Sequence, residues 1–246
     1  MTKFNITNFD AVAFDLEGTI ANTIPTHHST RMQAFERHGY GHISREQHEL
    51  GQTYGSSHFD VLGGILHAAG QINKDIQFSQ NPKVLDVIAT KGTLFKGAAA
   101  KGFDAMPRAI KFIEEIAPYF AGKMAIVTSS EAEFIFPFLE RHNLRKYFAN
   151  EHIIGHESVI AEGLGVKPSG DPYILGLRRL DARKLLVFED TTSGVASAKR
   201  AGATVIALGF DFQNNQLFRA GKLEYPPDEL VASFDEAAEL LGIKIK

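Results

Sequence analysis

Short apolar runs alternate along much of the chain with longer segments of helical periodicity. Residues 9–16, 123–128, 185–188 and 204–208 have the continuous apolar character of strands that are buried on both faces. Apolar residues recur three or four positions apart in 107–117, 131–142, 172–180 and 194–201, which predicts amphipathic helices, and 230–241 indicates a final strand and helix. The alternation predicts an α/β fold, a doubly wound parallel sheet covered by helices on both faces.

Residues 22–97 interrupt this alternation, because they carry mostly helical periodicity and no convincing buried strand. We interpret this block as an α-helical domain inserted after the first strand, with residues 1–21 and 98–246 forming the α/β core. The Asn-Thr-Ile-Pro segment at 22–25 and the Gly-rich and Ala-rich segment at 96–102 have the composition of linkers on either side of the insertion.

Composition narrows the classes of function. Of the 246 residues 44% are hydrophobic and 22% are charged, which supports a sizeable globular core. The 26 Lys and Arg against 29 Asp and Glu give a net charge of -3, so nucleic acid and acidic membrane lipid are not expected partners. The chain has no cysteine and no apolar stretch of the ~20 residues that span a bilayer. We therefore expect a cytoplasmic protein whose chemistry relies on oxygen and nitrogen groups.

Polar residues follow several of the predicted strands, and the carboxyl ends of parallel strands form the ligand crevice of an open α/β sheet. Asp15 and Glu17 come directly after the first strand, and Gly18 permits the chain to turn and aim the two carboxylates differently. A polar turn that only ends the strand is the alternative. Glu189 and Asp190 end another strand, where they either cap the next helix or supply oxygen ligands for Mg²⁺.

Two further segments carry candidate chemistry. Thr128, Ser129 and Ser130 precede a predicted helix, so their hydroxyls either cap that helix or join its N-terminus in binding phosphate. Lys167 lies in a loop before another predicted helix, where a lysine is commonly a solvated surface charge.

Taken in order, these segments resemble the four motifs of the haloacid dehalogenase superfamily, in its helical-capped, phosphatase-like branch. The motifs are residues 14–20 (FDLEGTI), 127–130 (VTSS), 167–171 (KPSGD) and 188–195 (FEDTTSGV). The resemblance covers essentially the whole chain, and it implies a Rossmann-like core with a helical cap at 22–97.

The resemblance implies a role for each motif residue. Asp15 would be the nucleophile that forms an aspartyl-phosphate, with Glu17 as general acid and base and Lys167 as a catalytic cation that also binds phosphate. Thr128 and the Ser129 N–H would bind phosphoryl oxygens. Magnesium would be held by Asp15, the Glu17 carbonyl and Asp190, with Glu189 bound directly or through water. The expected reaction is hydrolysis of a small phosphomonoester, with a sugar phosphate as one such substrate.

Two residues bear on the expected activity: one differs from most of the superfamily, and the other lies in the inserted helical segment. Most members of the superfamily have Asp where this chain has Glu17, although enolase-phosphatases resemble it in using Glu. His27, in the segment Pro25-Thr-His-His28, falls where β-phosphoglucomutase has a histidine that assists the acid/base residue; an exposed helix histidine is the plain alternative.

A phosphosugar mutase similar to β-phosphoglucomutase is the nearest alternative function. The mutase cap grips a second phosphate with cationic side chains, whereas residues 51–73 of this chain contain no Lys or Arg. A non-catalytic binding protein on the same scaffold is a third alternative, motivated by Glu17. The expected partner is a small phosphorylated substrate, and a monomer is the default assembly.

Overall fold

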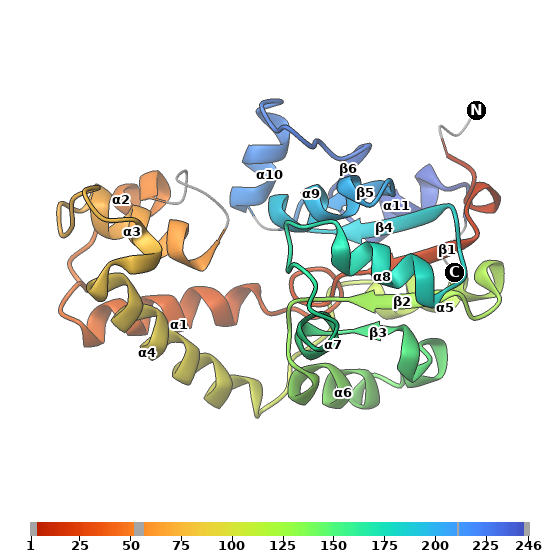
Figure 1. Cartoon of the computed structure of the whole chain (residues 1–246), viewed down its shortest axis with the longest axis horizontal. Coiled ribbons are helices and arrows are strands. Elements are labelled where there is room, and N and C mark those ends of the chain that lie inside the picture. The colour runs from red at the N-terminus through yellow and green to blue at the C-terminus, as the bar shows by residue number, and fades with distance from the viewer. Residues whose placement is uncertain (1–3, 52–56, 211, 244–246) are drawn as a thin grey trace. The chain divides into compact units, whose positions relative to one another are not determined.

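The computed structural model describes residues 4–51, 57–210 and 212–243 (Figure 1). By internal contacts the chain divides into two compact units, one made of Met1–Asn22 with Phe103–Lys246 and the other of Thr23–Gly102. The chain returns from the helical unit to the larger unit at residues 102–103, which is later than the boundary at 97–98 expected from the sequence. The reason is local: the last helix of the inserted unit runs through Ala99, since the alanines that suggested a linker are strong helix formers.

The larger unit contains a parallel sheet of strand order β3-β2-β1-β4-β5-β6. Its strands are β1 (Ala11–Phe14), β2 (Met124–Val127), β3 (Ile153–Ile154), β4 (Leu185–Glu189), β5 (Thr204–Leu208) and β6 (Glu229–Val231). Its helices are α5 (Ala109–Phe120), α6 (Ala132–Arg141), α7 (His156–Ala161), α8 (Asp171–Arg179), α9 (Thr192–Arg200), α10 (Phe212–Arg219) and α11 (Phe234–Leu240). The chain winds outward from β1 in both directions, which is the doubly wound arrangement that the sequence predicts.

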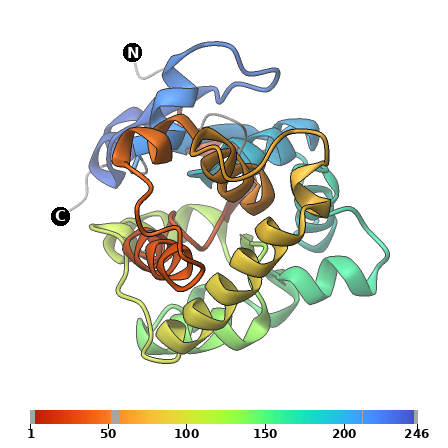
Figure 2. The same cartoon turned by 90° about the vertical axis from the view of Figure 1, so that its left-hand side faces the viewer.

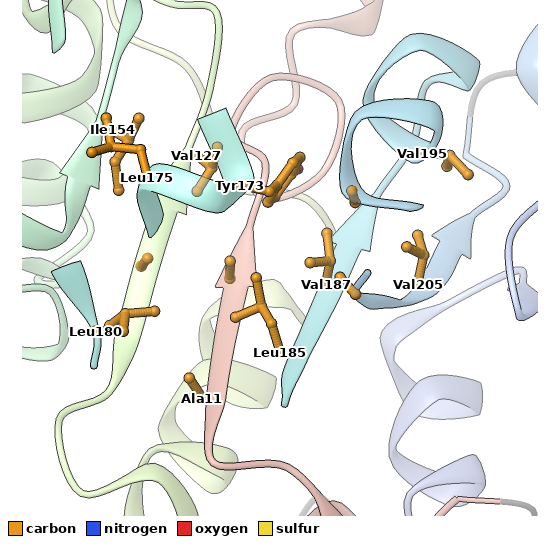
Figure 3. Packing of buried hydrophobic residues seen from close by; sticks show 14 of the residues in the cluster. Ala11, Val127, Ile154, Tyr173, Leu175, Leu180, Leu185, Val187, Val195 and Val205 are labelled. Carbon is orange, nitrogen blue, oxygen red and sulfur yellow. The ribbon is translucent and has the colours of Figure 1, made fainter. Parts of the chain in front are cut away.

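Alternate residues of each strand face opposite layers of helices. One face packs Ala13, Val127 and Val187 against α8 and α9, and Figure 3 shows Tyr173 and Leu175 of α8 over the strands. The opposite face is aromatic: Phe14 and Phe188, neighbours on β1 and β4, stack with ring centroids 5.1 Å apart. Phe112 of α5 meets Phe188 edge-on at 5.0 Å. Two apolar faces explain why the strands read as continuous hydrophobic runs.

The smaller unit is helical. It consists of α1 (Ile24–Arg37), α2 (Arg45–Gly51), α3 (His58–Ala68) and α4 (Pro82–Ala99). Helix α1 packs on α4 and α2 on α3, and α1 and α4 can be followed in red-orange and gold in Figure 2. Phe35, Leu62, Ile65 and Val87 lie in its buried core. Among the described residues, no helix combines the length and the apolar character needed to cross a membrane.

Candidate active site

Strands β1 and β4 are neighbours in the sheet, and both deliver carboxylates at their carboxyl ends. Phe14 pairs with Phe188 in the ladder, and the Asp15 N–H donates to the Phe188 carbonyl at 3.0 Å. Asp15 therefore leaves β1 beside Glu189, the last residue of β4. Ligand oxygens of Asp15, Glu189 and Asp190 all lie within 4.8 Å of one another, and all three residues are buried. Such a cluster needs positive charge or hydrogen-bond donors to offset its desolvation.

Lys167 supplies part of that charge. Its ammonium Nζ lies 2.7 Å from Oδ1 of Asp15 and 2.6 Å from Oε1 of Glu189, and it donates to the Val127 carbonyl at 2.9 Å. The Lys167 side chain is only 7% exposed. The surface-charge interpretation of this lysine is therefore wrong: the loop before α8 turns the side chain inward to the ends of β1, β2 and β4.

Both oxygens of Glu189 are occupied by donors. Oε1 accepts from Lys167 and from the Tyr173 hydroxyl at 3.0 Å, while Oε2 accepts from the Asp190 N–H at 3.1 Å and from the Thr191 N–H and hydroxyl at 3.2 Å each. A carboxylate offers about four lone-pair positions, so this one is saturated. A Cβ on Gly194 would lie 1.7 Å from Oε1, and this close approach explains why a glycine stands in the first turn of α9.

Asp190 occupies the other side of the cluster. Its Oδ1 accepts from the Thr19 hydroxyl at 3.1 Å. Gly18 has a φ of +76°, and a Cβ at this position would lie 2.1 Å from Oδ2 of Asp190. Glycine at residue 18 thus serves two purposes, the left-handed turn after β1 and the close approach of the second carboxylate.

The electrostatics of the site show an excess of negative charge. Burial raises the pKa of Asp15 to about 8; Lys167 opposes this shift, while Glu189 and Glu17 add to it. Burial lowers the pKa of Lys167, but the carboxylates of Asp15 and Glu189 outweigh burial and hold the pKa above its usual value. Lys167 thus stays protonated, and its one positive charge does not balance the carboxylates around it.

Hydroxyl groups at the end of β2 reach the loop that follows β1. The Thr128 hydroxyl donates to the Ser130 hydroxyl at 3.1 Å, and the Ser130 hydroxyl donates to Oε1 of Glu17. Helix α6 has Glu131 as its N-cap, whose side chain makes no capping bond, and the Ala132 N–H at its start donates to Oε1 of Glu157 at 2.9 Å. The helix-capping interpretation of these hydroxyls is therefore wrong, because they interact with each other and with Glu17. Ser129, between them, is exposed.

The donor set of this cluster fits a magnesium ion. Carboxylates are the protein ligands that Mg²⁺ prefers, and Asp15 and Asp190 lie at one edge of the sheet with a negative charge that Lys167 leaves unbalanced. Glu189, whose oxygens are engaged by five donors, is less suited to direct ligation than its neighbours. The carboxylate of Glu17 is directed to Ser130.

The structure brings most of the residues singled out in the sequence to one edge of the sheet in the larger unit: Asp15, Glu17, Thr128, Ser129, Lys167, Glu189 and Asp190. His27 lies in the helical unit, where its Nδ1 is 3.2 Å from the Lys91 ammonium and its ring stacks on Phe95 at 4.3 Å. Sequence reasoning missed the roles of Tyr173 and Ser130. Tyr173 lies among apolar residues of α8, so its sequence context does not distinguish it from a core residue. Ser130 belongs to the motif at 127–130, so the motif could have indicated a role for it.

Comparison with known proteins agrees with this geometry. A family profile described as haloacid dehalogenase-like hydrolase matches residues 12–208. A phosphoglycolate phosphatase of Vibrio parahaemolyticus is 25% identical over 238 residues, which is 94% of this chain and 96% of the relative.

Solved structures share the fold. A haloacid dehalogenase hydrolase of family IA, variant 3, from Entamoeba histolytica superposes with a TM-score of 0.68 at 22% identity, over 95% of this chain and 98% of the other. CbbY from Rhodobacter sphaeroides, in complex with xylulose-(1,5)bisphosphate, gives a TM-score of 0.63 at 24% identity, over 93% and 96%. With the family profile covering most of the chain and the carboxylates and lysine of its motifs meeting at one sheet edge, the chain belongs to the haloacid dehalogenase-like hydrolases.

Proposed function

We propose that this hydrolase is a magnesium-dependent phosphatase that acts on a small phosphomonoester, with Asp15 as the nucleophile and the helical unit as its cap. The observation that carries the proposal is the buried contact of Lys167 with both Asp15 and Glu189 at the point where the sheet reverses its winding. The phosphoglycolate phosphatases among the relatives, and the sugar bisphosphate bound to CbbY, support a small phosphorylated substrate.

In the first step an oxygen of Asp15 forms a bond to phosphorus while the bond from phosphorus to the alcohol oxygen breaks. Glu17 gives its proton to the departing alcohol. In the second step Glu17 takes a proton from a water molecule, which attacks phosphorus and breaks its bond to Asp15. Inorganic phosphate leaves and both carboxyl groups return to their starting states. Each displacement requires the attacking and leaving oxygens to lie in line through phosphorus.

The surrounding residues make this reaction possible by position and charge. Lys167 holds Asp15 in place through the 2.7 Å contact and offsets the repulsion between the carboxylate and the phosphoryl oxygens. The Ser129 N–H is a donor that we assign to those oxygens. The Thr128 hydroxyl is the other, once its proton turns from Ser130 to the bound phosphoryl group. Asp15, Asp190 and the Glu17 carbonyl would hold Mg²⁺, with Glu189 anchoring Lys167 or contacting the ion through water. When bound, Mg²⁺ supplies positive charge against the phosphoryl oxygens.

A substrate panel tests the proposal. Phosphate release is measured from 2-phosphoglycolate, xylulose 1,5-bisphosphate and both β-glucose 1-phosphate and glucose 6-phosphate, with Mg²⁺ or with chelator. The expected result is release from at least one substrate that disappears with chelator and in Asp15→Asn. Conversion of one glucose phosphate to the other without release would instead identify a mutase. Phosphate binding without turnover on the whole panel would favour a non-catalytic protein.

A further inference from the structure

The side chain of Glu17 has a specific partner on the neighbouring strand. Glu17 lies in the loop after β1, and Ser130 lies three residues beyond β2, the strand that pairs with β1 on one side. The Ser130 hydroxyl donates a hydrogen bond to Oε1 of Glu17. Ser130 is only 6% exposed, so this bond is made in a largely dry environment, where a hydrogen bond is stronger than in water.

Neighbouring groups fix the direction of this bond. The Thr128 hydroxyl donates to the Ser130 hydroxyl at 3.1 Å, and the Thr128 oxygen in turn accepts from the Ser130 N–H at 3.2 Å. The Ser130 carbonyl accepts from the His156 N–H at 3.0 Å, which holds the backbone in place. A hydroxyl has one proton, and with Thr128 as its donor, Ser130 directs that proton to Glu17.

The length of the Glu17 side chain matters for this contact. A glutamate has one more rotatable bond than an aspartate, so a free glutamate samples more orientations and loses more entropy when it is held in one. An aspartate at residue 17 would withdraw the carboxyl by about 1.5 Å, the length of one carbon–carbon bond. A displacement of that size breaks a hydrogen bond of normal length. The Ser130 contact is therefore specific to glutamate at this position.

We propose that Ser130 is a positioning residue for Glu17, holding the longer acid/base side chain in the single orientation from which it transfers a proton. The inference rests on the proposed function, in which Glu17 is the acid and base. Because Ser130 is also bonded to Thr128, it links the hydroxyl assigned to the phosphoryl group with the Glu17 carboxyl assigned to the leaving alcohol. Ser130 itself exchanges no proton with substrate.

A double-mutant cycle tests the pairing. Ser130→Ala, Glu17→Asp and the double variant are compared with the wild type on the best alkyl phosphate of the panel. Ser130→Ala is expected to lower kcat roughly tenfold, the effect of one hydrogen bond to a carboxyl that becomes charged as it gives up its proton, with little change in KM. In the Glu17→Asp background the same substitution is expected to change kcat less than twofold. Ser233→Ala, which removes a capping hydroxyl at α11, is the matched control that keeps wild-type turnover.

A second measurement does not depend on the activity of Glu17→Asp. p-Nitrophenolate is a good leaving group that departs without a proton from the enzyme, so its release in the first turnover does not require a positioned acid. Ser130→Ala is expected to leave that first-turnover rate within twofold of wild type while slowing the alkyl phosphate. Equal slowing of both substrates, or equal effects of Ser130→Ala in both backgrounds of the cycle, would overturn the inference.

The acid/base role of Glu17 and the positioning role of Ser130 are overturned by different results. Full turnover by Glu17→Gln would remove the proposed acid/base role and the Ser130 inference with it. Loss of turnover in Glu17→Gln together with no coupling between residues 17 and 130 would leave the proposed function standing and overturn the positioning role alone.

Discussion

The buried lysine predicts a large and measurable effect on stability. In Lys167→Met the apolar side chain keeps much of the volume, but the carboxylates of Asp15 and Glu189 lose the ammonium that lies 2.7 and 2.6 Å from them. At an effective dielectric of 20, Coulomb's law gives about 6 kcal/mol for each contact. The cost of taking the ammonium out of water offsets much of this sum, and breaking a buried pair typically costs about 3–5 kcal/mol.

Lys199 provides the matched control. Its ammonium lies 2.7 Å from Oδ2 of Asp228, the same distance as in the buried pair, but the Lys199 side chain is 25% exposed. A pair that water reaches is expected to contribute no more than about 1 kcal/mol. The two lysines have the same distance to a carboxylate but differ in exposure. Comparing their variants therefore separates the effect of burial on stability from the effect of the ion pair itself.

Urea unfolding measures the difference. The wild type, Lys167→Met and Lys199→Met are unfolded in chelator, so that no divalent cation substitutes for the missing charge. We expect Lys167→Met to lower the free energy of unfolding by about 3–5 kcal/mol, with an unchanged urea dependence. Equal losses for the two variants would show that Lys167 does not neutralise a buried acidic cluster.

Three other substitutions give distinct expectations. Tyr173→Phe removes the hydroxyl 3.0 Å from Glu189 but keeps the ring, and should lower the free energy of unfolding by about 1.5–3 kcal/mol in urea. Gly194→Ala places a Cβ 1.7 Å from Oε1 of Glu189, and should cost about 1–3 kcal/mol and at least tenfold in kcat by steady-state assay. Burial and nearby positive charge lower the pKa of His48 from 6.5 to about 4. Between these two pH values the imidazole is protonated in the unfolded chain but neutral in the folded protein. The free energy of unfolding therefore falls as the pH falls from 6.5 to about 4. In thermal unfolding, His48→Leu should lack this loss of stability, which amounts to at most ~3 kcal/mol in the wild type. An identical pH dependence of stability in the wild type and His48→Leu would contradict the prediction.

The predictable part of the fold is the part where packing leaves a clear periodicity. Strands β1, β2, β4 and β5 are buried on both faces, and their apolar runs locate them within a few residues. Strand β3 spans only Ile153–Ile154, which is too short to show a periodicity. The helix that follows it, α7, has only 6 residues. Ile153 and Ile154 become a strand because β2 offers an edge to pair with, which is a tertiary cause.

The candidate site divides in the same way. Asp15, Glu189 and Asp190 stand at strand ends, so topology alone brings them together once the strand order is known. The inward path of Lys167 depends on a loop, and the sequence gives no periodicity for it. Tyr173 fits the apolar face of α8 so well that its hydroxyl carries no separate signal. Its role appears only when the oxygen of Glu189 is found 3.0 Å away.

The most direct test of the proposed mechanism is to look for the phosphoryl group on Asp15. The enzyme is mixed with its best substrate and Mg²⁺, quenched in acid during turnover, digested and analysed by mass spectrometry. With Asp15 as the nucleophile, the peptide containing Asp15 is expected to gain the mass of one phosphoryl group, and this species should be absent in chelator and in Asp15→Asn. Turnover with an unmodified Asp15 peptide at every quench time, or undiminished turnover by Asp15→Asn, would contradict it.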